Sequence, residues 1–176
     1  FQIAMHAVPD LNFRGFHITP VFGTLGATIQ TGLLLGLTEQ QLTAALSLAV
    51  SHSSGVMGQF GSAAKYYHCG MAASNAIRSC ELPLAGLSGN ADVLESANGF
   101  YRAYAGKESP EAVRLGGADS SEWAMGQFSF LVKMYPCCSA AHAAVEGLKD
   151  LVADHAIAAE DVAEIVAEVP EYSIHN

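Results

Sequence analysis

Between Arg14 and Arg78 the chain carries only two formally charged side chains, Glu39 and Lys65. The run is rich in Ala, Gly and Leu, so most of it has to be buried, and tightly packed helices are favoured over a β-sandwich. Over the 176 residues, 51% are hydrophobic and 14% are charged. We therefore expect one well-buried domain, with further burial against a partner. The formal net charge of −9, without a basic stripe, argues against a nucleic-acid-binding protein.

Lys65 is the one basic side chain of this run, and burying an unpaired lysine is costly. His68 follows three residues later, and Gly70 allows another group to approach the backbone closely. An ammonium and an imidazole at this spacing could hold and protonate an anion. The alternative is a loop lysine that points to solvent, with His68 packed behind it. These residues alone leave both interpretations open.

Most helical signals lie before about residue 127, and they include a short helix predicted at residues 90–96. Thr38 and Gln41 have the spacing of a capping box, and Pro20 suits a first helical position. Pro9 is expected to stop the first helix and Pro83 to stop the fourth. The predicted helices are residues 1–8, 21–35, 39–50, 70–82 and 140–155, and a strand is predicted at 162–169. The chain therefore reads as mainly α, followed by an α+β region that it does not complete.

Four glycines recur in the second predicted helix and the turn that follows it, and would allow neighbouring helices to approach closely. They are Gly23, Gly26, Gly32 and Gly36. The most apolar run, residues 21–37, is interrupted by threonines and lacks basic flanks, so it does not predict a transmembrane helix.

The termini of the sequence and its cysteines bear on the cellular compartment. It lacks an initiator Met and a basic n-region, and its last strand would stand alone, so we expect a piece of a longer protein without a signal peptide. The four cysteines have no framework-like spacing, which suits a reducing compartment. We expect a cytoplasmic protein, or a mitochondrial one in a eukaryote.

Four spaced motifs, taken together, resemble those of one family. They are Gly15-Phe16-His17 with Phe22-Gly23-Thr24-Leu25-Gly26, Gly36-Leu37-Thr38 with the helix to Ser51-His52, Lys65-x-x-His68-x-Gly70-x-Ala72-Ala73, and Lys133-x-Tyr135-Pro136-Cys137-Cys138-x-x-x-His142. This order resembles the MmgE/PrpD family, which includes 2-methylcitrate dehydratases, cis-aconitate decarboxylases and an iminodisuccinate epimerase. The resemblance spans nearly the whole chain.

The resemblance implies a fold and an assembly. Residues 1–127 would be part of the family's helical-bundle domain, and residues 128–176 the beginning of its α+β lid domain. Asp-x-x-x-Thr and His-Pro elements, and a tyrosine from deeper in the lid, would complete the active site and are expected outside this sequence. The family pattern and the apolar, glycine-lined helices both favour a homodimer.

The resemblance also implies site residues. His17, Lys65 and His142 are the expected catalytic residues, with Lys65 binding a carboxylate and the histidines acting as acid or base. The expected substrate-binding residues are His68, Lys133 and Tyr135. For His68, contact with substrate and support of Lys65 remain equal alternatives.

Three further features of the sequence bear on the site: His52, the cysteine pair, and a difference from the family's usual motif. His52 is expected to be a packing residue at a helix end. Adjacent Cys137 and Cys138 chelate one ion poorly, so no metal or other cofactor is expected. Many family members have a Thr-Lys pair where this chain has Ala64-Lys65, followed here by two tyrosines, which puts the substrate within the family in doubt.

The leading hypothesis is a metal-independent lyase of small polycarboxylates, 2-methylcitrate dehydratase-like or cis-aconitate decarboxylase-like. Its acid/base chemistry would act at the carbon next to a carboxylate. One alternative is an isomerase or epimerase of the iminodisuccinate type on the same scaffold, because proton abstraction beside a carboxylate is common to both. Another is a truncated, non-catalytic helical module that binds partners through its apolar surface.

Overall fold

The computed structural model describes residues 2–108 and 132–170. The chain divides into two compact units, Phe1–Gln127 and Phe128–Asn176. The assignment of residues 128–176 to the start of a lid domain stays a prediction.

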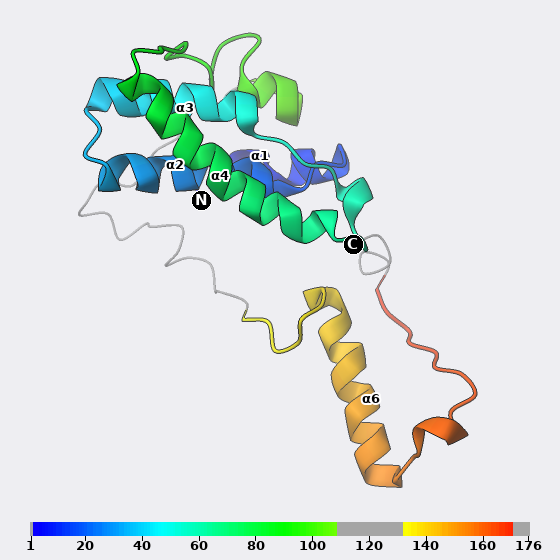
Figure 1. The fold of residues 1–176 in the computed structure, drawn as a ribbon. Coiled ribbons are helices and arrows are strands. Elements are labelled where there is room, and N and C mark those ends of the chain that lie inside the picture. Colours follow the sequence, from blue (N-terminus) through cyan, green and yellow to red (C-terminus); the bar gives the residue numbers. More distant parts are fainter. Residues whose placement is uncertain (1, 109–131, 171–176) are drawn as a thin grey trace, which may run out of the picture. The chain divides into compact units, whose positions relative to one another are not determined.

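The first unit is built from helices, as expected for a mainly α fold. Three of them, α2, α3 and α4, pack against one another, and α1 contacts α2 and a short π-helix (Figure 1). In order the elements are α1 (Gln2–Phe13), α2 (Ile18–Leu34), α3 (Glu39–His52), the 3-10 turn Met57–Gln59, α4 (Ala64–Leu84) and the π-helix Tyr101–Ala105.

The capping box predicted at Thr38 is confirmed. The Thr38 hydroxyl accepts from the backbone N–H of Gln41, whose side chain in turn accepts from the backbone N–H of Thr38. These two bonds satisfy backbone donors that have no partner within the helix. The box therefore fixes the start of α3 and ends the turn that follows α2.

Small side chains let the three packed helices approach one another. A Cβ atom added to Gly32 would lie 2.5 Å from Cδ1 of Leu42, so the close approach predicted for this glycine is confirmed. Gly23 likewise faces Cβ of Ala72, at 3.8 Å from an added Cβ. Gly26, by contrast, is exposed and has nothing within 4 Å, so it does not serve this purpose.

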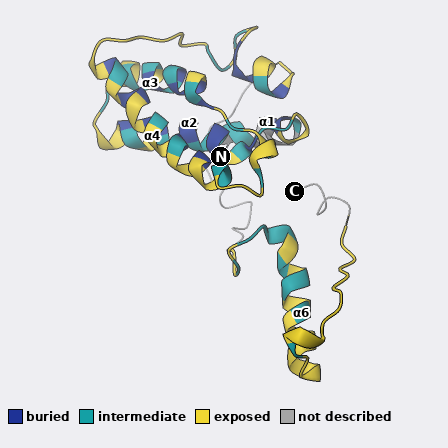
Figure 2. Cartoon of the chain, turned by 45° about the vertical axis from the view of Figure 1, so that its right-hand side comes forward, coloured by how far each residue is buried: buried dark blue, intermediate teal, exposed yellow. Residues whose placement is uncertain are grey.

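One apolar core lies between α1, α2, α3 and the π-helix, and it includes the largest fully buried side chains. Figure 2 colours the buried residues of these helices dark blue. Its buried members are Ala7, Leu11, Val21, Leu25, Ala49, Val50, Phe100, Tyr101 and Ala105. The Tyr104 hydroxyl donates to the Ser53 carbonyl and ties the π-helix to the end of α3. On α2, the buried hydroxyls of Thr24 and Thr28 donate one turn back, to the Pro20 and Thr24 carbonyls.

Several predicted helix ends are wrong. α2 begins at Ile18, so Pro20 is not its first residue. α1 continues through Pro9 to Phe13, because Leu11, which is fully buried, is held in the core and this packing outweighs the backbone bond that proline cannot make. α4 begins at Ala64 rather than Gly70 and includes Pro83, so Lys65 lies in its first turn and not in a loop.

The second unit contains the 3-10 turn Ser139–Ala141, α6 (His142–His155) and the 3-10 turn Ala159–Asp161. The helix predicted at residues 140–155 is thus present, although its first residues form the 3-10 turn. The strand predicted at 162–169 is wrong: these residues are extended but exposed, and no partner strand pairs with them within residues 132–170. An alternating pattern alone cannot supply the ladder bonds that define a strand.

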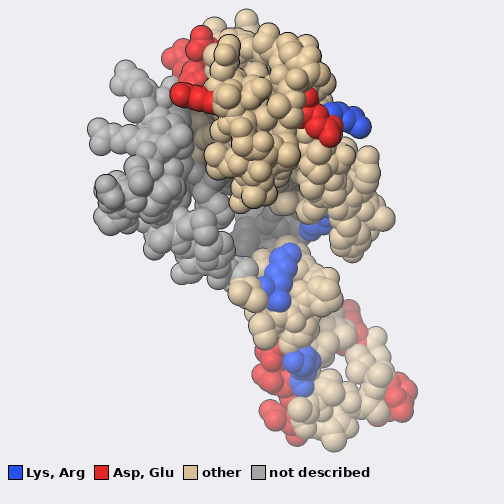
Figure 3. All heavy atoms as spheres, turned by 60° about the vertical axis from the view of Figure 1, so that its left-hand side comes forward, with Lys and Arg blue, Asp and Glu red and all other residues tan. Residues whose placement is uncertain are grey.

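Charged groups are sparse on the face of the molecule that Figure 3 shows, apart from the part containing α6. This agrees with the charge-poor run from which the first unit is built. Among the described residues, no helix is both long enough and apolar enough to cross a membrane.

Candidate active site

The segments that flank the α2–α3 hairpin meet in a short backbone ladder. His17 immediately precedes α2, and its N–H donates to the carbonyl of Gly55, which follows α3, over 3.0 Å. The N–H of Met57 donates to the Gly15 carbonyl over 2.8 Å, and Phe16 forms an antiparallel bridge with Val56. This ladder holds the Gly15-Phe16-His17 motif in one position beside the residues that lead into α4.

His68, on the second turn of α4, is brought directly to His17. Their Nδ1 atoms lie 2.9 Å apart, a hydrogen bond across 51 positions of sequence. Both side chains are buried, each residue being 6% exposed. The two histidines therefore form one buried pair.

Lys65 lies one turn before His68 on α4, and its ammonium contacts an aromatic ring. Its Nζ lies 4.0 Å from the centroid of Phe60, a cation–π contact. The same ring meets the His17 imidazole edge-on, with centroids 4.9 Å apart. Phe60 thus touches both groups, and no carboxylate pairs with Lys65 among the described residues. The ammonium is consequently available to an anion.

The electrostatics of this cluster favour a neutral His17. Burial, followed by repulsion from His68 and from Lys65, lowers the pKa of His17 below its usual value of 6.5. A neutral imidazole has one bare nitrogen and one N–H, so it can accept or donate a proton near neutral pH.

The two tyrosines that follow Lys65 are both largely exposed. Tyr66 is 77% and Tyr67 64% exposed. His52, predicted to be a packing residue, is the last residue of α3, and its Nδ1 lies 3.0 Å from Oγ of Ser79 on α4. His52 therefore links two helices.

The remaining predicted site residues belong to the second unit. The rings of Tyr135 and His142 meet edge-on with centroids 5.3 Å apart, and Lys133 is exposed. The Tyr135 hydroxyl donates to the Glu146 carboxylate and accepts from Lys149 over 2.7 Å. The hydrogen bond from Tyr135, followed by the attraction of Lys149, lowers the pKa of Glu146.

His142 retains one polar atom without a partner. Its Nε2 is buried and forms no hydrogen bond with the described part of the chain. The structure thus brings His17, Lys65 and His68 together in the first unit, and Tyr135 and His142 together in the second.

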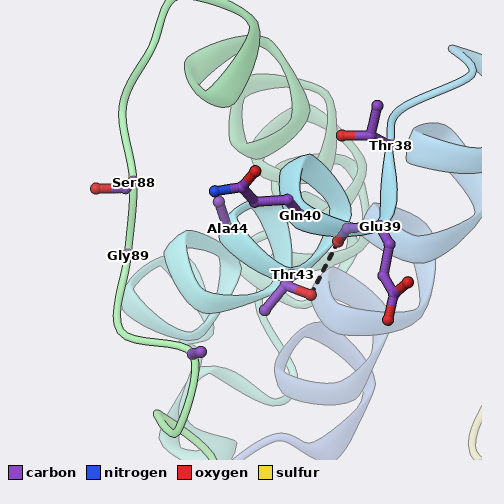
Figure 4. A pocket seen from close by; sticks show the side chains of 8 residues that line it. Thr38, Glu39, Gln40, Thr43, Ala44, Ser88 and Gly89 are labelled. Atoms are coloured by element: carbon purple, nitrogen blue, oxygen red, sulfur yellow. Dashed lines mark hydrogen bonds between the residues drawn. The ribbon is translucent and has the colours of Figure 1, made fainter.

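A metal cluster is absent from the described residues, and a surface pocket lies apart from the histidine pair. Within residues 2–108 and 132–170, no three His, Cys, Asp or Glu side chains come close enough to hold a metal ion. A surface pocket of about 670 Å³ lies between the first turns of α3 and the segment at Ser88 (Figure 4). None of its lining residues belongs to the histidine pair or contacts Lys65.

Two residues of the cluster were not singled out from the sequence. Phe60 was missed because an isolated aromatic residue in a glycine-bearing loop carries no distinguishing pattern. Gly55 was missed because it is one of several glycines in the same loop. Its φ of +124°, which residues with side chains rarely adopt, is visible only in the structure. The cue for both was their place between the His17 and Lys65 motifs.

Comparison with known proteins gives one consistent result. The sequence profile of the MmgE/PrpD N-terminal domain matches residues 1–113. The chain is 33% identical over 168 residues to cis-aconitate decarboxylase of Homo sapiens. The aligned region covers 93% of this chain and 34% of that protein. It is 33% identical over 149 residues to cis-aconitate decarboxylase of Aspergillus terreus, covering 81% of this chain and 30% of that protein. The chain spans about a third of the length of these relatives.

Proposed function

Because this chain belongs to the MmgE/PrpD family, we propose that it forms part of a lyase that removes carbon dioxide from a small unsaturated polycarboxylate such as cis-aconitate. The similarity to cis-aconitate decarboxylases of Homo sapiens and Aspergillus terreus supports this choice over dehydration. The observation that carries the proposal is the cluster of Lys65, His17 and His68, which combines a cation for a carboxylate with an imidazole for proton transfer.

Lys65 is the proposed carboxylate-binding group. Its ammonium rests on Phe60, which leaves its N–H donors free on the side away from the ring. A carboxylate bound there would form charge-assisted hydrogen bonds, which are roughly twice as strong as neutral ones. The absence of a carboxylate partner for Lys65 among the described residues fits this role.

His17 is the proposed proton donor to carbon. When the bond to the leaving carboxylate breaks, carbon dioxide departs and the electron pair stays on the carbon, which then takes a proton from His17. Solvent restores that proton. Burial is the largest cause of the lowered pKa of His17, and repulsion from His68 and Lys65 adds to it. A carboxylate bound at Lys65 would offset this repulsion and so favour the protonated imidazole that the step needs.

The site residues expected in the second unit are also part of the proposal. We propose that His142 acts as a further acid or base and that Lys133 and Tyr135 bind substrate. The Nε2 of His142 is buried and has no hydrogen-bond partner within residues 2–108 and 132–170, which fits a group that binds a ligand. Tyr135 would have to exchange its contact with Glu146 for one with substrate.

The test is product analysis with the intact protein. We expect carbon dioxide release from cis-aconitate, detected by a coupled assay, and loss of the corresponding carboxylate signal by 13C NMR. EDTA should leave the rate unchanged, because the proposed chemistry uses no metal. A new double bond formed from 2-methylcitrate would instead indicate a dehydratase, and inversion at a carbon without loss of atoms an epimerase. Failure to turn over any polycarboxylate would contradict the proposal.

Lys65→Met tests the role of the cation. The variant keeps the length of the side chain and removes the charge, so kcat/KM should fall by about 100-fold or more. Arg78→Met is the matched control, since Arg78 is an exposed cation on the same helix. Equal activity of both variants would exclude Lys65 from the site.

A homodimer is a further part of the proposal. Several large apolar side chains of the first unit are exposed, among them Leu34 at 89%, Leu33 at 65% and Ile77 at 51%. Large exposed apolar side chains of this kind fit a surface that a second copy of the protein covers. Light scattering coupled to size-exclusion chromatography should give twice the mass of the chain, and a monomer at micromolar concentration would contradict this.

A further inference from the structure

The contact between His17 and His68 restricts where their protons can lie. The two Nδ1 atoms are 2.9 Å apart, so one must carry a hydrogen and the other must be bare. If both carried a hydrogen, the two donors would face each other and the bond would be lost. The pair therefore exists either with His17 donating to His68 or with His68 donating to His17.

The acid role of His17 decides between the two arrangements. A protonated His17 carries hydrogens on both nitrogens, so it can keep the bond only if His68 is neutral and bare at Nδ1. His68 then holds its own hydrogen at Nε2. With the bond in the opposite sense, His17 would have to lose it each time it took up a proton.

The surroundings hold His68 in place for this task. A Cβ atom on Gly55 would lie 3.3 Å from both Nδ1 and Cε1 of His68, so the backbone closes this edge of the ring. Among the described residues, His17 is the hydrogen-bond partner of that Nδ1 atom.

Few other charges bear on the pair. Lys65 lies on the same helix as His68, and residues 55–63, which lead into α4, contain no charged side chain, nor do residues 18–34 of α2. On α1 and the residues that follow it, Asp10 pairs with Lys107, and Arg14 donates to the Ala103 carbonyl.

We propose that His68 is a positioning residue, whose Nδ1 accepts the Nδ1–H of His17 and leaves Nε2 of His17 as the atom that exchanges protons with the substrate. This rests on the proposed function, in which His17 is the acid. It replaces both earlier expectations for His68, contact with substrate and support of Lys65. The proposal also explains why the acceptor is a histidine and not a carboxylate. A neutral acceptor orients the ring of His17 without adding a negative charge beside an anionic substrate.

The tautomer can be measured without activity. In protein labelled with 15N-histidine, two-dimensional NMR at pH 8 should show His17 with a hydrogen on Nδ1 and a bare Nε2, and His68 with the opposite pattern. Signals are assigned by their loss in His17→Gln and His68→Asn. A His17 that carries its hydrogen on Nε2 would overturn the proposal, whatever reaction the protein catalyses.

Two variants of His68 then separate positioning from direct contact. Asn places its Oδ1 acceptor where Nδ1 of His68 lies, but has no group at the position of Nε2. We expect His68→Asn to keep kcat within about fivefold of the parent. His68→Leu, which has no acceptor, should lower kcat by at least about tenfold with little change in KM. An equal loss in both variants would mean that His68 acts through Nε2 on the substrate, which overturns the proposal.

The variants also need a structural readout. His17 in His68→Asn should retain the hydrogen on Nδ1, whereas in His68→Leu it should shift to the other tautomer or to a mixture. An unchanged tautomer in His68→Leu would overturn the proposal. If His68→Leu does not fold, the NMR measurement on the parent and on His68→Asn still shows which histidine donates in the pair. Absence of turnover with every polycarboxylate, with the expected tautomers present, would reject the function and leave the arrangement of the pair intact.

Discussion

Gly55 packs so closely against the imidazole of His68 and the ring of Pro20 that an added Cβ atom would crowd the imidazole and clash with the proline. A Cβ atom on Gly55 would lie 3.3 Å from Nδ1 and Cε1 of His68 and 2.7 Å from Cγ of Pro20, and the residue has a φ of +124°. Its carbonyl also accepts from the N–H of His17. One glycine therefore holds both members of the histidine pair.

Gly55→Ala should destabilise the protein and disturb the pair. The unfavourable φ and the contact with Pro20 together predict a loss of about 1–3 kcal/mol in the free energy of unfolding. Urea denaturation measures this. Gly58→Ala is the control, because an added Cβ there meets nothing within 4 Å, and it should change stability by less than about 0.5 kcal/mol. Equal stability of the two variants would contradict the packing described here.

Stability should depend on pH through His17. Its pKa in the folded protein lies below the usual 6.5, so between these two values the unfolded chain binds more protons than the folded one. The contribution of His17 should therefore lower the free energy of unfolding as pH falls below 6.5 and have no effect above it. Comparing His17→Asn with the parent from pH 5 to 8 isolates this slope. A parent that becomes more stable on acidification relative to the variant would contradict the shift.

Thr38→Ala should remove the cap of α3. Loss of the hydroxyl leaves the N–H of Gln41 without its acceptor, which predicts a loss of about 1 kcal/mol. Gln40→Ala, an exposed change in the same turn, should be close to neutral. Thermal unfolding followed by circular dichroism compares the two, and a Thr38→Ala protein as stable as Gln40→Ala would show that the box contributes little.

Leu11 and Phe13 allow a matched test of the core on one helix. Leu11 is fully buried, whereas Phe13 is 92% exposed. Leu11→Ala should cost about 2–5 kcal/mol because it leaves a cavity, and Phe13→Ala should cost less than about 0.5 kcal/mol. If both had small effects, α1 would not be anchored in the core and its continuation past Pro9 would need another explanation.

Local signals in the sequence were reliable where the chain makes local contacts. The capping box at Thr38 needs only residues three positions apart, and it is present as predicted. Gly32 also allows the close approach of a neighbouring helix that its place in an apolar helix predicted. Breaker signals were less reliable: Pro9 and Pro83 both lie inside helices. A proline inside a helix always costs a backbone hydrogen bond. Whether this cost ends the helix depends on how well the residues after the proline pack.

By itself the sequence determined the helical character of the first unit, through its charge-poor run and caps, and the family, through its spaced motifs. Only the tertiary structure decided that His68 bonds to His17, and that Phe60 touches both His17 and Lys65. Those contacts join residues up to 51 positions apart. They exist because the α2–α3 hairpin closes on itself at Gly55 and α4 packs across it, and no local pattern encodes that closure.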